Sequence, residues 1–245
     1  MTEIAASDYV SGGYYLTRFS ARAACMSPEL LPDRILSASR CIGKFFPNTW
    51  CIEWCRSTDE ERIEAASAFG IAPGNLPAVM AWASDPHSSA FGWPNAFYTL
   101  EAAREARATL LPEGLDIVIF GLGLHNSDFK RFWRAAKPPD RKPGCAPVGP
   151  SGVFECVNLR SGIAEAGDPA GFELLNTEYG LLACSWLCNG LEKVCADRLG
   201  IRPNPRGFID TYAEASRCAE YISTPEVEAE AGLWLPWLVT TYRSR

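Results

Sequence analysis

Hydrophobic and polar positions follow two different spacings along this chain. Short runs of aromatic, β-branched and other apolar residues, bounded by turn-forming residues, predict β-strands. The clearest run, LDIVIFGLGL, begins at Leu115, and the last one, LWLPWLVTTY, begins at Leu233. Strands are predicted in five segments: 12–19, 49–55, 115–124, 153–159 and 233–242.

Apolar residues three and four positions apart predict helices elsewhere. Two of the helix starts carry a capping box, in which a threonine and a carboxylate three residues later bond to each other's backbone amides. These boxes are Thr58-Asp59-Glu60-Glu61 and Thr211-Tyr212-Ala213-Glu214. Gly70 and Gly200 stand where a left-handed residue commonly ends a helix. The predicted helices are 28–45, 59–69, 99–110, 127–137, 177–199, which is the longest, and one that follows Thr211.

Prolines mark the segments in which no regular element is expected. Residues 71–95 contain scattered prolines and are predicted to be irregular. Five prolines fall within residues 137–150, so an irregular proline-rich loop is predicted at about 137–152. Strands and helices alternate with no repeat of fixed period. The pattern predicts one α+β domain over 1–245, with a mixed or antiparallel sheet packed with several helices.

Composition and charge narrow the classes of function. The net charge is −6, which argues against a broad nucleic-acid-binding surface and is compatible with a basic protein partner. No apolar run approaches the roughly 20 residues of a membrane span. The opening residues, MTEIAASDYV, do not show a basic segment followed by an apolar one, so no secretory signal is predicted. We therefore expect a cytoplasmic protein that binds neither nucleic acid nor membrane.

The ten cysteines predict packing rather than chemistry. Free cysteines in a reducing compartment behave as small hydrophobic residues. Cys51/Cys55 and Cys184/Cys188 are each four apart, whereas a zinc site normally uses closer pairs or a nearby histidine. Cys184, Cys188 and Cys195 would share one apolar stripe of the predicted helix 177–199. No metal and no cofactor are predicted.

Histidine supplies the best enzymatic candidate. The segment Gly121-Leu122-Gly123 follows a strand and precedes a helix, but Asn126 stands where a dinucleotide fingerprint has its third glycine. A tight turn with a helix cap explains it. His125 at the end of the strand is the residue that an enzyme would use, with a cysteine or carboxylate partner. His87 is expected in an exposed loop. No catalytic constellation is evident, and the chain is predicted not to be an enzyme.

Two acidic runs are candidates for binding a partner. Carboxylates near a helix start are stabilised by the helix dipole, which explains both runs without any partner. The alternative is an acidic surface that attracts a basic partner and speeds association. The candidate partner-binding residues are Asp59, Glu60, Glu61 and Glu64 in the first run, and Glu226, Glu228 and Glu230 in the second.

Blocks at both ends of the chain resemble a known family. An aromatic strand with an arginine precedes an amphipathic helix, then a proline and a tryptophan. Later a helix, a proline-bearing turn and a Gly-Trp strand follow. In this order the chain is similar to the fifty-second immunity-protein family of bacterial polymorphic toxin systems. The residues that carry the resemblance are Tyr14-Tyr15, Arg18, Ala24-Cys25, Ile35-Leu36, Ile42, Phe46-Pro47, Trp50, Leu181 to Leu199, Pro203, Pro205, Gly232-Leu233-Trp234-Leu235 and Val239-Thr240-Thr241-Tyr242.

The resemblance implies an immunity protein, or antitoxin, that binds and neutralises a cognate toxin. Toxins paired with this family resemble restriction-endonuclease-fold nucleases, and some are delivered by type VI secretion. Such a complex would bury an interface of about 1,600 Å² with a few aromatic anchors. Exposed members of Trp50, Trp54, Trp93, Trp234 and Trp237 would supply them.

Two other classes of function remain open. A small cytosolic hydrolase or transferase would use His125, and a chaperone-like component of the same secretion cluster would bind its cargo without neutralising it.

Overall fold

The computed structural model describes residues 5–46, 58–83, 91–92, 96–112, 116–136, 152–165, 167–178 and 181–243. The predicted strand at 49–55 lies outside these ranges. So do His87, Trp50, Trp54, Trp93 and the predicted loop at 137–152 except for its last residue.

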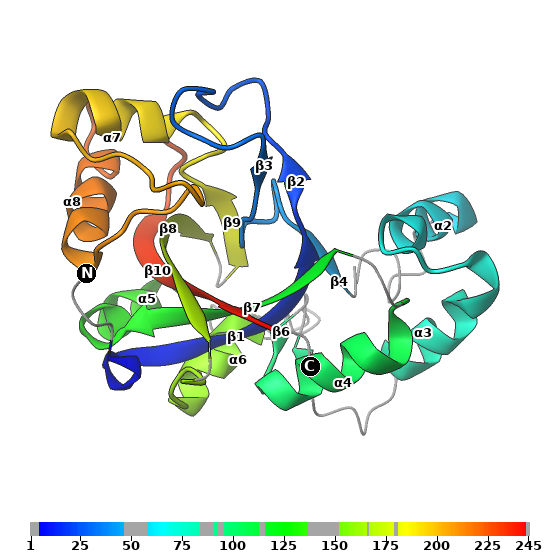
Figure 1. The fold of residues 1–245 in the computed structure, drawn as a ribbon. Helices are drawn as coiled ribbons and strands as arrows, with labels where there is room; N and C mark the ends of the chain where they lie inside the picture. The colour runs from blue at the N-terminus through cyan, green and yellow to red at the C-terminus, as the bar shows by residue number, and fades with distance from the viewer. Residues whose placement is uncertain are drawn as a thin grey trace, which may run out of the picture.

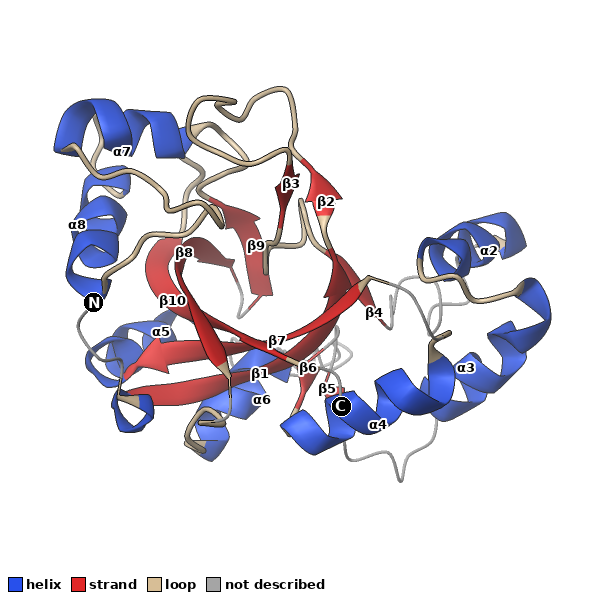
Figure 2. Ribbon diagram, in the orientation of Figure 1, coloured by secondary structure: helices blue, strands red, loops and turns tan. Residues whose placement is uncertain are grey.

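An eight-stranded antiparallel sheet forms the centre of the molecule (Figure 2). Its order is β5-β6-β1-β7-β10-β8-β9, and β4 also pairs with β1. The long strands curl strongly, and β2 and β3 form a separate two-stranded ribbon. The bounds are β1 Tyr9–Arg18, β2 Ser20–Ala21, β3 Arg34–Ile35, β4 Lys44–Phe46, β5 Phe91–Gly92, β6 Ala96–Phe97, β7 Ile117–His125, β8 Asp168–Glu178, β9 Leu181–Ser185 and β10 Leu233–Tyr242.

Helices cover the sheet in three groups (Figure 1). The helices α7 and α8 lie at one end of the sheet, α2 to α4 lie at the opposite end, and α5 and α6 pack beneath it. With the antiparallel sheet this confirms the predicted α+β class. The bounds are α2 Asp59–Ala68, α3 Leu76–Ala83, α4 Leu100–Leu110, α5 Phe129–Ala136, α6 Gly152–Leu159, α7 Leu191–Leu199 and α8 Tyr212–Ile222, with short 3₁₀ helices η1 Ala6–Asp8, η2 Pro73–Asn75 and η3 Asn126–Asp128.

Each group of helices closes its own hydrophobic cluster against the sheet. Phe132 of α5 packs in one cluster with Trp237 of β10. Trp234, three residues earlier in β10, packs with α7 and α8 in a second cluster. Alternate residues of β10 therefore fill cores on both faces of the sheet, as the strand repeat requires. Trp234 and Trp237 are fully buried, so they do not serve as exposed anchors for a partner.

Several predicted elements are confirmed. Strands β1, β7 and β10 and helices α2, α4 and α8 lie where the sequence places them. The two glycines of β1 also predict a turn that leads into the strand. In the structure they form a β-bulge within it, between Ser11 and Tyr14. Gly13 takes a φ of +99°, a left-handed conformation that side chains disfavour. A Cβ on Gly12 would lie 2.6 Å from the Trp237 ring, so this glycine makes room for the core.

The predicted helix at 28–45 is wrong. The segment forms loops around the short strand β3. Ser27 does not cap a helix. Its backbone N–H donates to the buried carboxylate of Glu192 at 2.8 Å. Leu31, Ile35 and Ala38 are nevertheless buried. Their helical spacing therefore reflects burial along an irregular loop rather than a helix.

Two further predictions are wrong for a related reason. Residues 153–159 form helix α6 rather than a strand, and residues 177–199 form β9, a turn and α7 rather than one helix. Residues 153–159 and 181–188 are mostly apolar, and a short apolar run does not distinguish a strand from a helix. Residues 71–95, expected to be irregular, contain helix α3. In the described part of the chain, no helix has the length and apolar character needed to span a membrane.

Candidate functional site

The first acidic run lies on helix α2, whose start at Asp59 agrees with the helix-dipole interpretation. Glu60 and Glu64 are exposed. Ile63 is 40% exposed, which makes it one of the few exposed large apolar residues among those described. Residues three and four apart are neighbours on a helix surface, so the Glu60 carboxylate lies beside both Ile63 and Glu64. The side chains of Asp59 and Glu61 lie outside what the structure describes.

The second acidic run does not lie at a helix start. Glu226, Glu228 and Glu230 are exposed in the irregular segment between α8, which ends at Ile222, and β10. The helix-dipole explanation is therefore wrong for this run. Because α2 and α8 lie at opposite ends of the sheet in Figure 1, the two runs do not form one surface.

His125 ends strand β7 and caps the 3₁₀ turn η3. Its Nδ1 accepts the backbone N–H of Ser127 at 3.3 Å and lies 2.7 Å from the Ser127 hydroxyl. The imidazole also stacks on Tyr212 of α8, with ring centroids 4.0 Å apart. The sequence predicts that Asn126 or Ser127 caps the helical segment that follows the strand. In the structure His125 is the capping residue.

A chain of hydrogen bonds leads from this cap to a buried acid. The Ser127 hydroxyl lies 2.8 Å from the Tyr212 hydroxyl, which donates to Asp128 at 2.7 Å. Asp128 is buried and pairs with Arg131 at 3.0 Å. Burial raises the pKa of Tyr212, and the hydrogen bond to Asp128 acts in the same direction. These contacts fasten the end of β7 to α8 and account for each polar group without a substrate.

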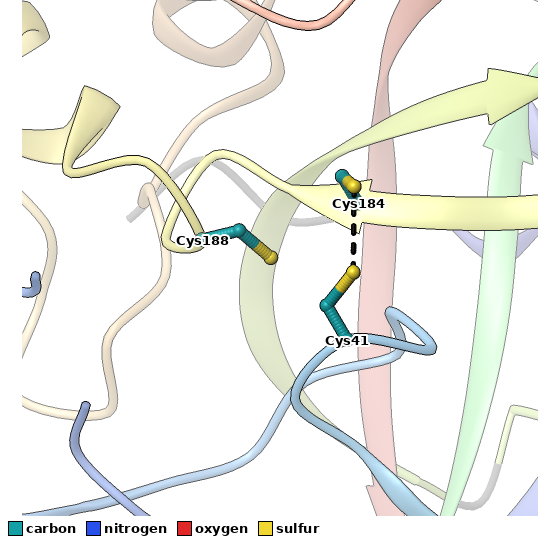
Figure 3. A group of neighbouring side chains, drawn as sticks. All are labelled: Cys41, Cys184 and Cys188. Carbon is teal, nitrogen blue, oxygen red and sulfur yellow. Dashed lines mark hydrogen bonds between the residues drawn. The ribbon is translucent and has the colours of Figure 1, made fainter.

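Three cysteines from separate segments of the chain converge (Figure 3). Cys41 lies in the loop between β3 and β4, Cys184 in β9, and Cys188 in the turn before α7. Their sulfur atoms all lie within 4.8 Å of one another, and Cys41 Sγ is 3.4 Å from Cys184 Sγ. Cys41 is exposed, whereas the other two are half-buried.

The sulfur atoms are held by neighbouring polar groups. The backbone N–H of Ser185 donates to Cys188 Sγ at 3.2 Å, and the Ser39 hydroxyl lies 3.9 Å from the same sulfur. The Cys41 thiol donates to the carbonyl of Ala183 at 3.3 Å. Burial raises the pKa of the Cys188 thiol to about 12 and also raises that of Cys184, to which the adjacent Cys41 thiol contributes. The thiols of Cys184 and Cys188 are therefore neutral at pH 7.

A fully buried carboxylate supports the loop that carries Cys41. Glu173 of β8 accepts the Ser37 hydroxyl at 2.5 Å and the Ala38 backbone N–H at 2.8 Å. The hydroxyl of Ser185 also hydrogen-bonds to it. Burial raises the pKa of Glu173 from 4.5 to about 7, although these hydrogen bonds act in the opposite direction.

The sequence predicts that Cys184 and Cys188 pack on one stripe of a helix over 177–199. The structure has no such helix, because Cys184 lies in β9 and Cys188 in the turn after it. Cys195 lies apart from this pair in α7, where it is buried beside Cys218 of α8. The third member of the cluster, Cys41, is 143 residues from Cys184. A C-x₃-C spacing just before a turn was the available signal, and nothing local pointed to Cys41.

No family model, curated protein or solved structure matches this chain. The resemblance to the immunity family therefore rests on the sequence blocks named above.

Proposed function

We propose that this chain is a cytoplasmic immunity protein that binds a cognate nuclease effector and occludes its active or substrate-binding surface. The observation that carries the proposal is the exposed surface of α2 on which Glu60 lies beside the exposed side chains of Ile63 and Glu64.

The chemistry of a nuclease fits this face. A nuclease presents cationic side chains to the phosphate backbone of its substrate. Carboxylates on an inhibitor attract the same cationic groups and speed the encounter, while an apolar side chain that becomes desolvated supplies binding energy. The net charge of −6 adds a long-range attraction to a basic partner.

The proposal places binding on α2 alone. The run at Glu226, Glu228 and Glu230 follows α8, at the other end of the sheet from α2, and an interface of about 800 Å² per partner covers only part of the molecular surface. The second run then serves as a matched control.

The test is co-expression followed by titration. The product of the adjacent open reading frame is expressed with and without this chain, and its toxicity and complex formation are measured. We expect the neighbour to kill cells alone and to form a tight complex that restores growth. A harmless neighbour, or one that kills regardless, contradicts the proposal.

Charge reversal then locates the interface. Glu60→Lys with Glu64→Lys is expected to weaken binding tenfold or more, because attraction becomes repulsion. Ile63→Ser should weaken it further by removing the apolar contact. Glu226→Lys with Glu228→Lys makes the same change in net charge and should leave affinity nearly unchanged. Equal losses from the two reversals would show that only overall charge matters.

The alternative hypothesis, a hydrolase or transferase that uses His125, is tested with the variant His125→Ala. The contacts of His125 and Ser127 are those of a cap that fastens β7 to α8, so the variant should keep its biological activity and lose only stability. Loss of activity in a folded variant would favour the enzyme.

A further inference from the structure

We propose that Cys41, Cys184 and Cys188 bind one Zn²⁺ ion through their three sulfur atoms. The proposal is independent of the immunity function and concerns a different end of the molecule.

The sulfur positions fit a single ion. Zinc binds thiolate sulfur at about 2.3 Å, so two sulfurs of a tetrahedral site lie about 3.8 Å apart. The spacing of Cys41 and Cys184, 3.4 Å, and the upper limit of 4.8 Å for the group lie on either side of that value. Figure 3 shows the three side chains directed toward a common point. Small changes in side-chain torsion therefore complete the geometry.

The surroundings suit thiolate ligands. A backbone N–H and a hydroxyl, from Ser185 and Ser39, lie against Cys188 Sγ, and such donors orient a metal-bound thiolate and disperse its charge. Exposed Cys41 leaves a path from solvent. In the part of the chain that the structure describes, no other three His, Cys, Asp or Glu side chains converge in this way.

Zinc fits better than a softer ion because oxygen is also at hand. The side chain of Asn189 hydrogen-bonds to the carboxylate of Glu230, which is near enough to Cys184 to raise the pKa of its thiol but lies outside the converging group. Three protein ligands leave the fourth position to a water molecule. Zinc accepts mixed sulfur and oxygen ligands, whereas Cu⁺ favours sulfur alone.

The scaffold holds the ligands in place before an ion binds. The Arg40 backbone N–H donates to the Leu182 carbonyl at 3.1 Å, which joins the Cys41 loop to β9. Glu173 holds the same loop through Ser37 and Ala38. Less ordering is needed on binding, so the ion would add a clamp between the loop and the turn that begins α7.

The experiment is a metal titration of the reduced, metal-free full-length chain under anaerobic conditions. Co²⁺ serves as the probe, since tetrahedral thiolate ligation gives strong visible bands and a sulfur-to-cobalt charge-transfer band in the near ultraviolet. We expect one Co²⁺ per chain, displaced by one equivalent of Zn²⁺. Chelation after zinc loading should lower the melting temperature.

Variants assign the signal to these three residues. Cys41→Ser, Cys184→Ser and Cys188→Ser should each weaken Co²⁺ binding at least a hundredfold, and circular dichroism checks that each variant folds. Cys41 is the decisive position, because its side chain is exposed and the variant should fold. The control is Cys25→Ser, an exposed thiol that bonds to the carbonyl of Cys188 but lies outside the converging group.

Three results would overturn the proposal. They are the absence of a thiolate charge-transfer band in the parent chain, unchanged Co²⁺ binding in folded Cys41→Ser, and recovery of the chain with a Cys41–Cys184 disulfide that forms in the presence of excess Zn²⁺.

Discussion

Carboxylates occupy two opposite settings in this molecule. Glu173 and Glu192 are fully buried and accept backbone N–H groups from the loops on either side of β3. Glu60 and Glu64 on α2 are exposed on a helix face. The buried pair determines where distant segments lie, whereas the exposed pair is free to meet a partner. Burial therefore separates the carboxylates that hold the fold from those that the proposed function assigns to a partner, a distinction that their spacing in the sequence does not reveal.

The largest expected effect is that of removing the buried carboxylate of β8. Glu173→Ala should lower the free energy of unfolding by about 3 kcal/mol, because it leaves the Ala38 N–H unpaired, removes the acceptor of the Ser37 hydroxyl and opens a cavity. Urea denaturation measures the change. Glu173→Gln is the matched control, since its amide can still accept from Ala38 and donate to Ser37. A loss below 1 kcal/mol for the alanine variant would contradict the structural role.

Stability should also depend on pH through the same residue. The pKa of Glu173 is raised to about 7 in the folded state from 4.5, so the folded state holds this proton more tightly than the unfolded chain. Its contribution is therefore complete below about pH 4.5 and is lost as the pH rises through 7. From pH 5 to pH 7 the free energy of unfolding should fall by about 2 kcal/mol from this group. Unfolding curves of the parent and of Glu173→Gln give the difference, which should vanish if another group is responsible.

The smallest effect is expected from the exposed pair. Glu60→Gln with Glu64→Gln should change the free energy of unfolding by less than about 0.5 kcal/mol, as is usual for solvated surface positions. The same denaturation measurement checks this. A large loss would show that these carboxylates support the fold, and it would remove the reason for assigning them to a partner.

Local signals predicted their own elements well. The Thr211 hydroxyl accepts the Glu214 N–H at 3.2 Å, as the capping box at the start of α8 predicts. Gly70 and Gly200, predicted helix ends, have φ of +68° and +70°. A cap or a left-handed glycine acts over three or four residues, so a sequence pattern is enough to locate it.

Long-range polar contacts explain what the sequence did not reveal. Ser37 and Glu173 are 136 residues apart. Their bond helps to hold residues 36–39 in a non-helical path, although the apolar spacing there favoured a helix. The cysteine cluster depends on the same loop, since Cys41 reaches Cys184 only once that path is formed. The exposed face of α2 differs, because its position and its carboxylates were predicted, and only the exposure of Ile63 came from the structure.

The position of β10 has a consequence for folding during synthesis. This strand lies between β7 and β8 in the sheet, yet it is made after both. A ribosome that has released residues up to about 230 therefore presents two strands with unsatisfied backbone edges and two half-built cores that await Trp234 and Trp237. Such edges favour pairing with other chains. The nascent protein should depend on chaperones until residues 233–242 insert between the waiting strands and complete the sheet.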